Sequence, residues 1–179
     1  MQTTDSITFD PSLYNRATHW TFLLYEQNGV SLVIPLPNAN VMSFIRPFNN
    51  TVQCQQFAEA NLQKMITLFV WDDNMKDWLN RVTNIPVSLH EIKIFCNSND
   101  QPFLDAWLQR YINRYTTVTF EIIPYEELNY SLMIFGIAHL KKLHADFQQN
   151  SPLYPQLNRN YKRICRALAN YFWNEANTE

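Results

Sequence analysis

The chain has 179 residues, of which 46% are hydrophobic and 15% aromatic, enough apolar material to build one folded domain without disulfides or metal. Charged residues amount to only 17% and the formal net charge is −2, which gives the chain no bulk attraction to nucleic acid or to an anionic membrane. The scarcity of glycine, with Gly29 and Gly136 alone, excludes most phosphate-binding loops, because such loops need a backbone that can approach the ligand closely.

Short apolar runs in the first half of the chain predict strands. After a loose lead-in over residues 1–17, strands are expected over residues 20–25, marginally over 30–34 in a segment that also holds Pro35 and Pro37, and over 41–48. Residues 65–71 are apolar nearly throughout, which is typical of a strand covered on both faces. Between them, Thr51 is the expected N-cap of a helix with inward positions at steps of three and four residues: Cys54, Phe57, Ala58, Asn61 and Leu62.

The second half continues the alternation. Strands are expected over residues 91–96, nearer an edge of the sheet, and over 117–123. Asp72 and Asp73 can cap a helix that ends near Pro86 and carries the apolar positions Met75, Trp78, Leu79 and Val82. Further helical stripes are predicted at Phe103, Trp107, Leu108, Tyr111 and Ile112, over residues 131–147, and at Leu157, Tyr161, Ile164, Leu168 and Phe172.

Strands that alternate with helices over short connections indicate an α/β fold. We expect a three-layer, open, mostly parallel sheet of the receiver or flavodoxin-like type, with an extra C-terminal helix and a single domain over residues 18–179. Such sheets carry their sites beyond the carboxyl ends of the strands. The residues to examine are therefore those at the strand ends, above all Glu26, Asp72, Asp73 and Ser98.

These residues fill only part of a phosphoacceptor site. Asp72 or Asp73 stands where a receiver domain carries its phosphorylated aspartate, and Ser98 supplies a hydroxyl after the next strand. Glu26 is a single acid where a magnesium-binding pair is needed. No lysine follows the strand over 117–123 to balance an acyl phosphate. The sequence thus favours a domain without catalysis, and an enzyme acting on a nucleotide or phosphoryl substrate around Asp72 is the alternative.

The cysteines and histidines predict neither a metal site nor a cofactor. Cys54, Cys96 and Cys165 are far apart and odd in number, so they are interpreted as thiols of a reducing compartment. His139 and His144 are five residues apart in one predicted helix and do not share a face. Without a signal peptide or a run long enough to span a membrane, the expected location is cytoplasmic.

The last third of the chain is basic and ends in a series of aromatic residues. The basic side chains form a candidate binding face for an acidic partner or, as an alternative, for nucleic acid: Lys141, Lys142, Arg159, Lys162, Arg163 and Arg166. A solvated helix face explains the same residues. Tyr171, Phe172 and Trp173 exceed what one buried stripe needs, which favours a protein–protein interface, either with a protein partner or in a homo-oligomer.

One segment resembles a known module. Residues 48–57, with Cys54 and Phe57, lead into the apolar residues 66–70, then to Ile85-Pro86 and to residues 92–96. This order resembles a receiver-like N-terminal module of large rotifer multidomain proteins, over about residues 44–97. The resemblance implies a receiver-like fold, and modules of this kind have no established activity. The function expected from the sequence as a whole is that of a non-catalytic, receiver-like interaction or regulatory domain.

Overall fold

The computed structural model describes residues 2–34, 38–81 and 84–179, and these divide into two compact units, each discontinuous in sequence. The sheet unit comprises residues 18–32 and 45–128, and the helical unit comprises residues 1–17, 33–44 and 129–179. Val82, Pro35 and Pro37, which carried sequence-based expectations, lie outside the described residues. The single domain expected over residues 18–179 stays a prediction.

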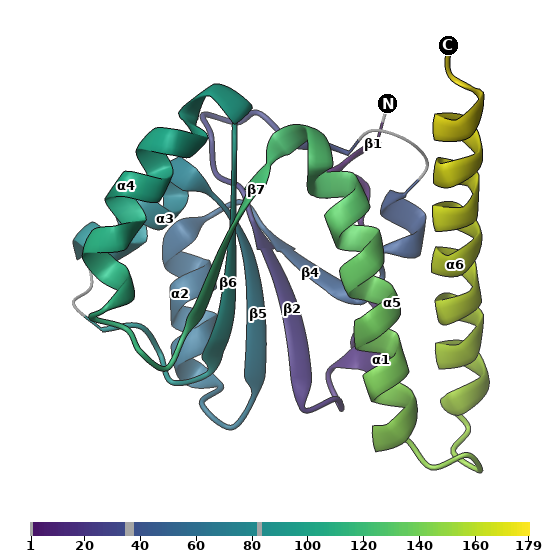
Figure 1. The fold of residues 1–179 in the computed structure, drawn as a ribbon. Helices are drawn as coiled ribbons and strands as arrows, with labels where there is room; N and C mark the ends of the chain where they lie inside the picture. The colour runs from purple at the N-terminus through teal and green to yellow at the C-terminus, as the bar shows by residue number, and fades with distance from the viewer. Residues whose placement is uncertain (1, 35–37, 82–83) are drawn as a thin grey trace. The chain divides into compact units, whose positions relative to one another are not determined.

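The sheet unit is built on five strands, all parallel. They are β2 (His19–Leu24), β4 (Ile45–Phe48), β5 (Met65–Trp71), β6 (Leu89–Cys96) and β7 (Thr119–Pro124). Their order in the sheet is β4-β2-β5-β6-β7, shown in Figure 1. The direction of winding therefore reverses between β2 and β5. This order confirms the predicted α/β fold of flavodoxin-like type, including the extra C-terminal helix.

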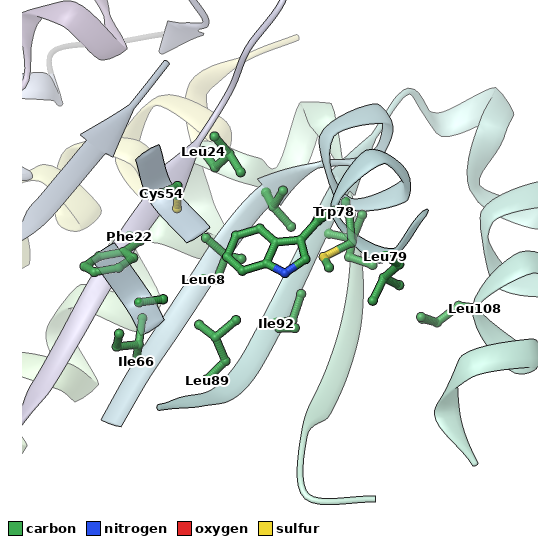
Figure 2. Packing of buried hydrophobic residues seen from close by; sticks show 14 of the residues in the cluster. Phe22, Leu24, Cys54, Ile66, Leu68, Trp78, Leu79, Leu89, Ile92 and Leu108 are labelled. Atoms are coloured by element: carbon green, nitrogen blue, oxygen red, sulfur yellow. The ribbon is translucent and has the colours of Figure 1, made fainter. Parts of the chain in front are cut away.

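Three helices of the sheet unit pack on one face of these strands (Figure 1). They are α2 (Thr51–Ala60), α3 (Asp72–Arg81) and α4 (Gln101–Ile112). Alternate strand residues point to this face, as the period of two requires, and Trp78 of α3 lies fully buried among them (Figure 2). The strand predicted over residues 65–71 has the predicted bounds, and it is the middle strand of the sheet.

Four expectations about the helix faces and ends are wrong. Phe172, expected in the buried stripe of the last helix, is 49% exposed. Asn50, not Thr51, is the N-cap of α2, because the Asn50 side chain accepts the Gln53 amide at 2.9 Å while Thr51 already has helical geometry. Leu62 lies beyond the end of α2 and is 55% exposed. Phe103 is 77% exposed, and the neighbouring Leu104 packs into the core instead.

The helical unit contains a small antiparallel sheet of β1 (Gln2–Thr3) and β3 (Val33–Ile34). The strand expected over residues 30–34 is thus shorter and does not join the parallel sheet. The strand expected over 41–48 is likewise shorter, because residues 39–41 form a 3-10 turn. Residues 2–17, expected as a loose lead-in, also contain α1 (Pro11–Tyr14), whose Leu13 and Tyr14 are buried. Further 3-10 turns cover Thr4–Ser6, Ser98–Asp100 and Tyr125–Glu127.

Two long helices, α5 (Leu128–Asp146) and α6 (Tyr154–Asn177), lie side by side and run antiparallel in Figure 1. The ring of Tyr130 near the start of α5 is 5.4 Å from that of Tyr171 near the end of α6. At the opposite ends, the rings of His144 and Tyr154 are 5.2 Å apart. No helix among the described residues combines the length and the apolar character that crossing a bilayer requires.

Gly136 allows α5 to approach its neighbours closely. A Cβ atom at this position would lie 2.8 Å from Cζ of Phe44 and 3.1 Å from Cδ1 of Ile164. Phe44 cannot retreat easily, since its ring is 1% exposed and contacts the rings of Tyr14 and Phe135. Glycine in a helix interior costs about 1 kcal/mol relative to alanine, so its presence here reflects space rather than helix propensity.

We expect Gly136→Ala to destabilise the protein by about 1–3 kcal/mol, because overpacking a filled core outweighs the gain in helix propensity. In a Phe44→Leu background the same change should become neutral or stabilising, since the shorter side chain leaves room for the methyl group. Chemical denaturation of the four variants of this double-mutant cycle measures the coupling. Equal effects of Gly136→Ala in both backgrounds would contradict the steric explanation.

Candidate functional site at the carboxyl ends of the strands

The segments that follow the parallel strands form one edge of the sheet unit, called here the carboxyl edge. It comprises residues 25–27 after β2, 49–51 after β4, 72–74 after β5, 97–98 after β6 and 125–127 after β7. In doubly wound sheets a ligand binds at this edge where the winding reverses, here between β2 and β5. All four candidate residues, Glu26, Asp72, Asp73 and Ser98, belong to the carboxyl edge.

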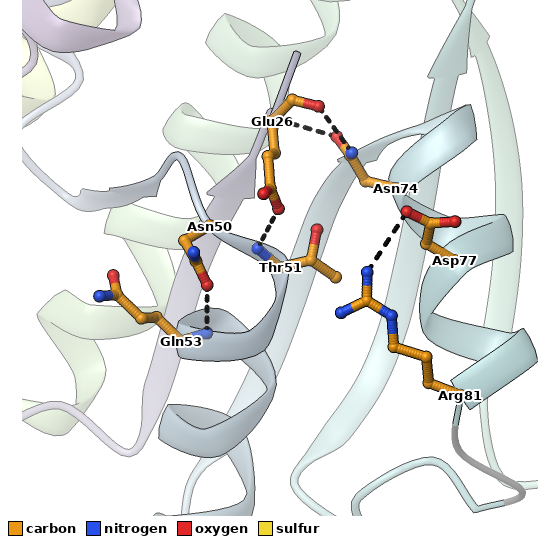
Figure 3. Close-up of polar contacts among 7 residues, drawn as sticks. All are labelled: Glu26, Asn50, Thr51, Gln53, Asn74, Asp77 and Arg81. Carbon is orange, nitrogen blue, oxygen red and sulfur yellow. Dashed lines mark hydrogen bonds and ion pairs between the residues drawn. The ribbon is translucent and has the colours of Figure 1, made fainter. Parts of the chain in front are cut away.

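Glu26 joins the end of β2 to the first turns of two helices, as Figure 3 shows. Its carboxylate oxygen Oε2 accepts the backbone amide of Thr51 at 2.6 Å, at the start of α2. Its own backbone amide donates to Oδ1 of Asn74 at 2.9 Å, and its carbonyl oxygen accepts from Nδ2 of Asn74 at 2.9 Å. The carboxylate therefore serves as an anion at a helix N-terminus.

These contacts favour the charged form of Glu26. The hydrogen bond from the Thr51 amide is the main reason that the pKa of Glu26 is lowered from its ordinary value of 4.5, and the positive charge of Arg81 acts in the same direction. Arg81 itself is ion-paired with Asp77 at 3.5 Å (Figure 3). Glu26 is thus a bound structural anion rather than a proton donor at neutral pH.

Asp72 and Asp73 lie in the first turn of α3, and their environments differ. Asp72 is 5% exposed; its Oδ2 forms an ion pair with Lys76 at 3.5 Å, and its Oδ1 is buried without a hydrogen bond to the part of the chain that the structure describes. Burial, and then the charge of Asp73, raises the pKa of Asp72. Asp73 is exposed, and its Oδ2 accepts a long hydrogen bond of 3.4 Å from the side-chain Nε2 of Gln27. Asp72, which directly follows β5, is therefore less accessible than Asp73.

Ser98 and the end of β7 complete the edge. The Ser98 hydroxyl donates to Glu126, which lowers the pKa of that carboxyl, and Pro124 ends β7. The cation on the neighbouring strand, Lys93, is held between Glu91 and Glu121. Burial raises the pKa of Cys96 to about 11, so its thiol is protonated at neutral pH and is a poor nucleophile.

The candidate residues are therefore engaged separately. Glu26, Asp72 and Ser98 bond to Thr51, Lys76 and Glu126 respectively, and the described residues include no hydrogen bond or ion pair that joins two of these three candidates. Over residues 2–34, 38–81 and 84–179, no group of three or more His, Cys, Asp or Glu is placed to hold a metal ion. At the carboxyl edge, the hydrogen bonds of Glu26 and Asn74 connect the end of a strand with the first turns of two helices.

Asn74 and Asn50 were not recognised as important from the sequence. Asn74 is 4% exposed and bonds across 48 positions of the chain, whereas Asn50 caps α2. The signal for Asn50 was its position one residue before Thr51, since asparagine is among the preferred N-cap residues. Asn74 had no local signal, because its partner is fixed only by the pairing of β2 with β5.

The basic candidates lie in the helical unit. Lys141 and Lys142 are exposed on α5, and the other four are exposed on α6: Arg159, Lys162, Arg163 and Arg166. Arg159 donates to Oε1 of Gln156 at 2.7 Å. Arg163 lines a pocket of the helical unit together with Asp10 and Asn160.

Replacement of Glu26 by Gln should destabilise the protein at pH 7 by no more than about 1 kcal/mol. The effect is small because the glutamine side-chain oxygen can still accept from the Thr51 backbone amide, and because the carboxylate that is lost is exposed to solvent. The pKa of Glu26 is lowered by folding, so its charged form stabilises the protein above the unfolded pKa. That contribution is lost as the pH falls through the lower folded pKa.

The free-energy difference between the wild type and Glu26→Gln should accordingly be constant near neutral pH, decline as the pH falls below the ordinary pKa of 4.5, and disappear below the lower folded pKa. Denaturant titrations between about pH 7 and pH 3 measure it. Glu127→Gln, at an exposed position of the same edge, is the matched control and should show no such difference. A pH-independent effect of Glu26→Gln would refute the helix-anion role.

No protein-family model, curated protein or solved structure matches this chain. The resemblance of residues 44–97 to a receiver-like rotifer module therefore stays a prediction. The observed β4–α2–β5 succession in that segment is common to parallel α/β sheets in general. The function of the chain must accordingly be argued from its own geometry.

Proposed function

We propose that this chain is a receiver-like regulatory module without catalysis that binds a protein partner. The observation that carries the proposal is a mainly aromatic patch of the helical unit, called here the aromatic patch, in which Ile134, Phe172 and Trp173 are exposed and Tyr130 and Tyr171 are partly exposed. Its cytoplasmic setting is supported by the three cysteines, each of which is a free thiol.

The aromatic patch is formed where the start of α5 meets the end of α6. The ring of Tyr130 is 5.4 Å from that of Tyr171 and 6.0 Å from that of Phe172. Phe172 is 49% exposed and Trp173 is 70% exposed. Tryptophan and tyrosine are enriched among the residues that contribute most to protein–protein binding, because they bury a large area with few rotatable bonds.

The positive charges that precede the aromatic patch on α6 indicate that the partner is acidic. Lys162, Arg163 and Arg166 precede the patch along α6 and are exposed. An acidic rim around an apolar contact would complement this arrangement, since charged residues at the edge of an interface steer association. Phosphate groups of a nucleic acid would be attracted by the same cations, but the net charge of −2 opposes such binding over the chain as a whole.

The contacts at the carboxyl edge support the absence of catalysis. Glu26 holds the first turn of α2, and buried Asp72 has Lys76 as its ion partner. Phosphoryl transfer to Asp72 would require an accessible carboxylate, bound Mg²⁺ and a nearby cation to balance the acyl phosphate. The alternative, an enzyme acting on a nucleotide or phosphoryl substrate, would need Glu26 to exchange its helix contact for a metal ion.

The interaction proposal predicts that the double variant Phe172→Ser/Trp173→Ser folds normally and loses partner binding or self-association by roughly 30-fold, since truncating such an anchor costs about 2 kcal/mol or more. Sedimentation velocity of the purified chain detects self-association, and photocrosslinking from position 173 in cells detects another partner. Phe103→Ser, which removes a still more exposed phenyl group from α4, is the control. Equal losses in both variants, or a monomer without crosslinks, would overturn the proposal.

The non-catalytic proposal predicts that Mg²⁺ with acetyl phosphate or beryllofluoride leaves the protein unchanged. Because Asp72 is buried beside Lys76, neither reagent should gain access to its carboxylate. Amide spectra recorded by NMR, with and without the reagents, measure the response. Saturable shifts at residues 72–74 that disappear in Asp72→Asn would establish a phosphoacceptor instead.

A further inference from the structure

The helical unit contains a pocket of about 340 Å³ whose lining includes charged and polar side chains. It lies at the lower end of the roughly 300–1,000 Å³ range of small-molecule sites. Three segments that are far apart in the chain form its walls, namely residues 8–11, residues 40–43 and α6. Its lining is Thr8, Phe9, Asp10, Pro11, Asn40, Ser43, Gln156, Asn160 and Arg163.

Two opposite charges line this pocket without pairing. Asp10 precedes α1 and Arg163 extends from α6, and the two form no ion pair within 4.0 Å. Across residues 2–34, 38–81 and 84–179, Arg163 has no hydrogen-bond or ion-pair partner. A guanidinium group offers a planar fork of donors that matches a carboxylate.

Asp10 is oriented by the helix that follows it. One oxygen, Oδ1, accepts from the Ser12 amide at 3.1 Å, the Ser12 hydroxyl at 2.6 Å and the Leu13 amide at 3.3 Å. The second oxygen, Oδ2, makes no hydrogen bond to the described residues. The N-cap thus fixes the carboxylate and leaves one of its oxygens available to a donor in the pocket.

The floor of the pocket is a hydrogen-bond network centred on Asn160, which is 4% exposed. Its Nδ2 donates to the Tyr14 hydroxyl at 2.8 Å and to the Ser43 hydroxyl at 3.3 Å, while its Oδ1 accepts from Gln156 at 2.9 Å. Burial raises the pKa of Tyr14 to about 12, so its hydroxyl stays neutral. The floor is therefore rigid and preorganised.

We infer that this pocket binds a small zwitterion, such as a free amino acid, with its carboxylate on Arg163 and its ammonium group on Oδ2 of Asp10. A simple anion would be repelled by Asp10, and a simple cation would be repelled by Arg163, whereas a ligand with both charges satisfies both residues. The inference does not depend on the proposed protein partner: the aromatic patch shares no residue with the pocket lining, and Arg163 alone belongs both to this lining and to the basic residues beside the patch.

The test is a titration of the full ¹⁵N-labelled chain with the common L-amino acids, each to about 10 mM, followed through the side-chain signals of Arg163 and Asn160. At least one amino acid should bind saturably with a Kd below about 1 mM. Its N-acetyl derivative, which lacks the ammonium group, and its methyl ester, which lacks the carboxylate, should each bind at least roughly tenfold more weakly.

Asp10→Asn and Arg163→Gln should each weaken binding roughly tenfold or more, since each removes one charge. Asparagine is an equally good N-cap, so Asp10→Asn keeps α1 capped, and Arg163 is exposed. Lys162→Gln is the matched control and should bind as the wild type does. Failure of every amino acid to bind, equal binding of the N-acetyl derivative, or equal losses in Lys162→Gln and Arg163→Gln would each overturn the inference.

Discussion

The double hydrogen bond between Asn74 and the backbone of Glu26 is the contact on which the carboxyl edge of the sheet depends. A strand that ends inside a parallel sheet leaves an N–H and a C=O that must find partners, because a buried unpaired backbone group is costly. One buried side chain provides both partners for the end of β2. The same contact joins the first turn of α3 to the segment after β2, at the point where the winding reverses between β2 and β5.

The arrangement at this edge also explains why acids at strand ends need not indicate catalysis. A receiver site requires its carboxylates to face a shared metal ion. Here Glu26 faces the first turn of α2, where the helix dipole and a free amide stabilise a negative charge. Asp72 points into the sheet unit, where burial raises its pKa and disfavours the charged form. The same residue types thus perform structural work when helix N-termini are their nearest partners.

The helical unit combines close apolar packing around Phe44 with a hydrogen-bond network around Asn160. Gly136 lets α5 approach Phe44 closely, with no space for a methyl group. In the same unit, Asn160 joins α6 to Tyr14 and Ser43 through hydrogen bonds. The pocket of this unit is lined by Asn160 and Ser43 of the network and by Arg163 and Asp10, which form no ion pair with each other.

The sequence by itself determined the elements whose signal is local. The continuous apolar run of β5, the alternation of β6 and the stripe of α6 predicted these elements and the α/β class, since periodicity and chain direction require no knowledge of partners. Only the tertiary structure decided that Asn74 bonds to Glu26, that Phe103 is exposed, and that Asp10 and Arg163 share a pocket. Each of these depends on contacts between segments far apart in the chain, and a side chain's role there is set by its neighbours rather than by its own residue type.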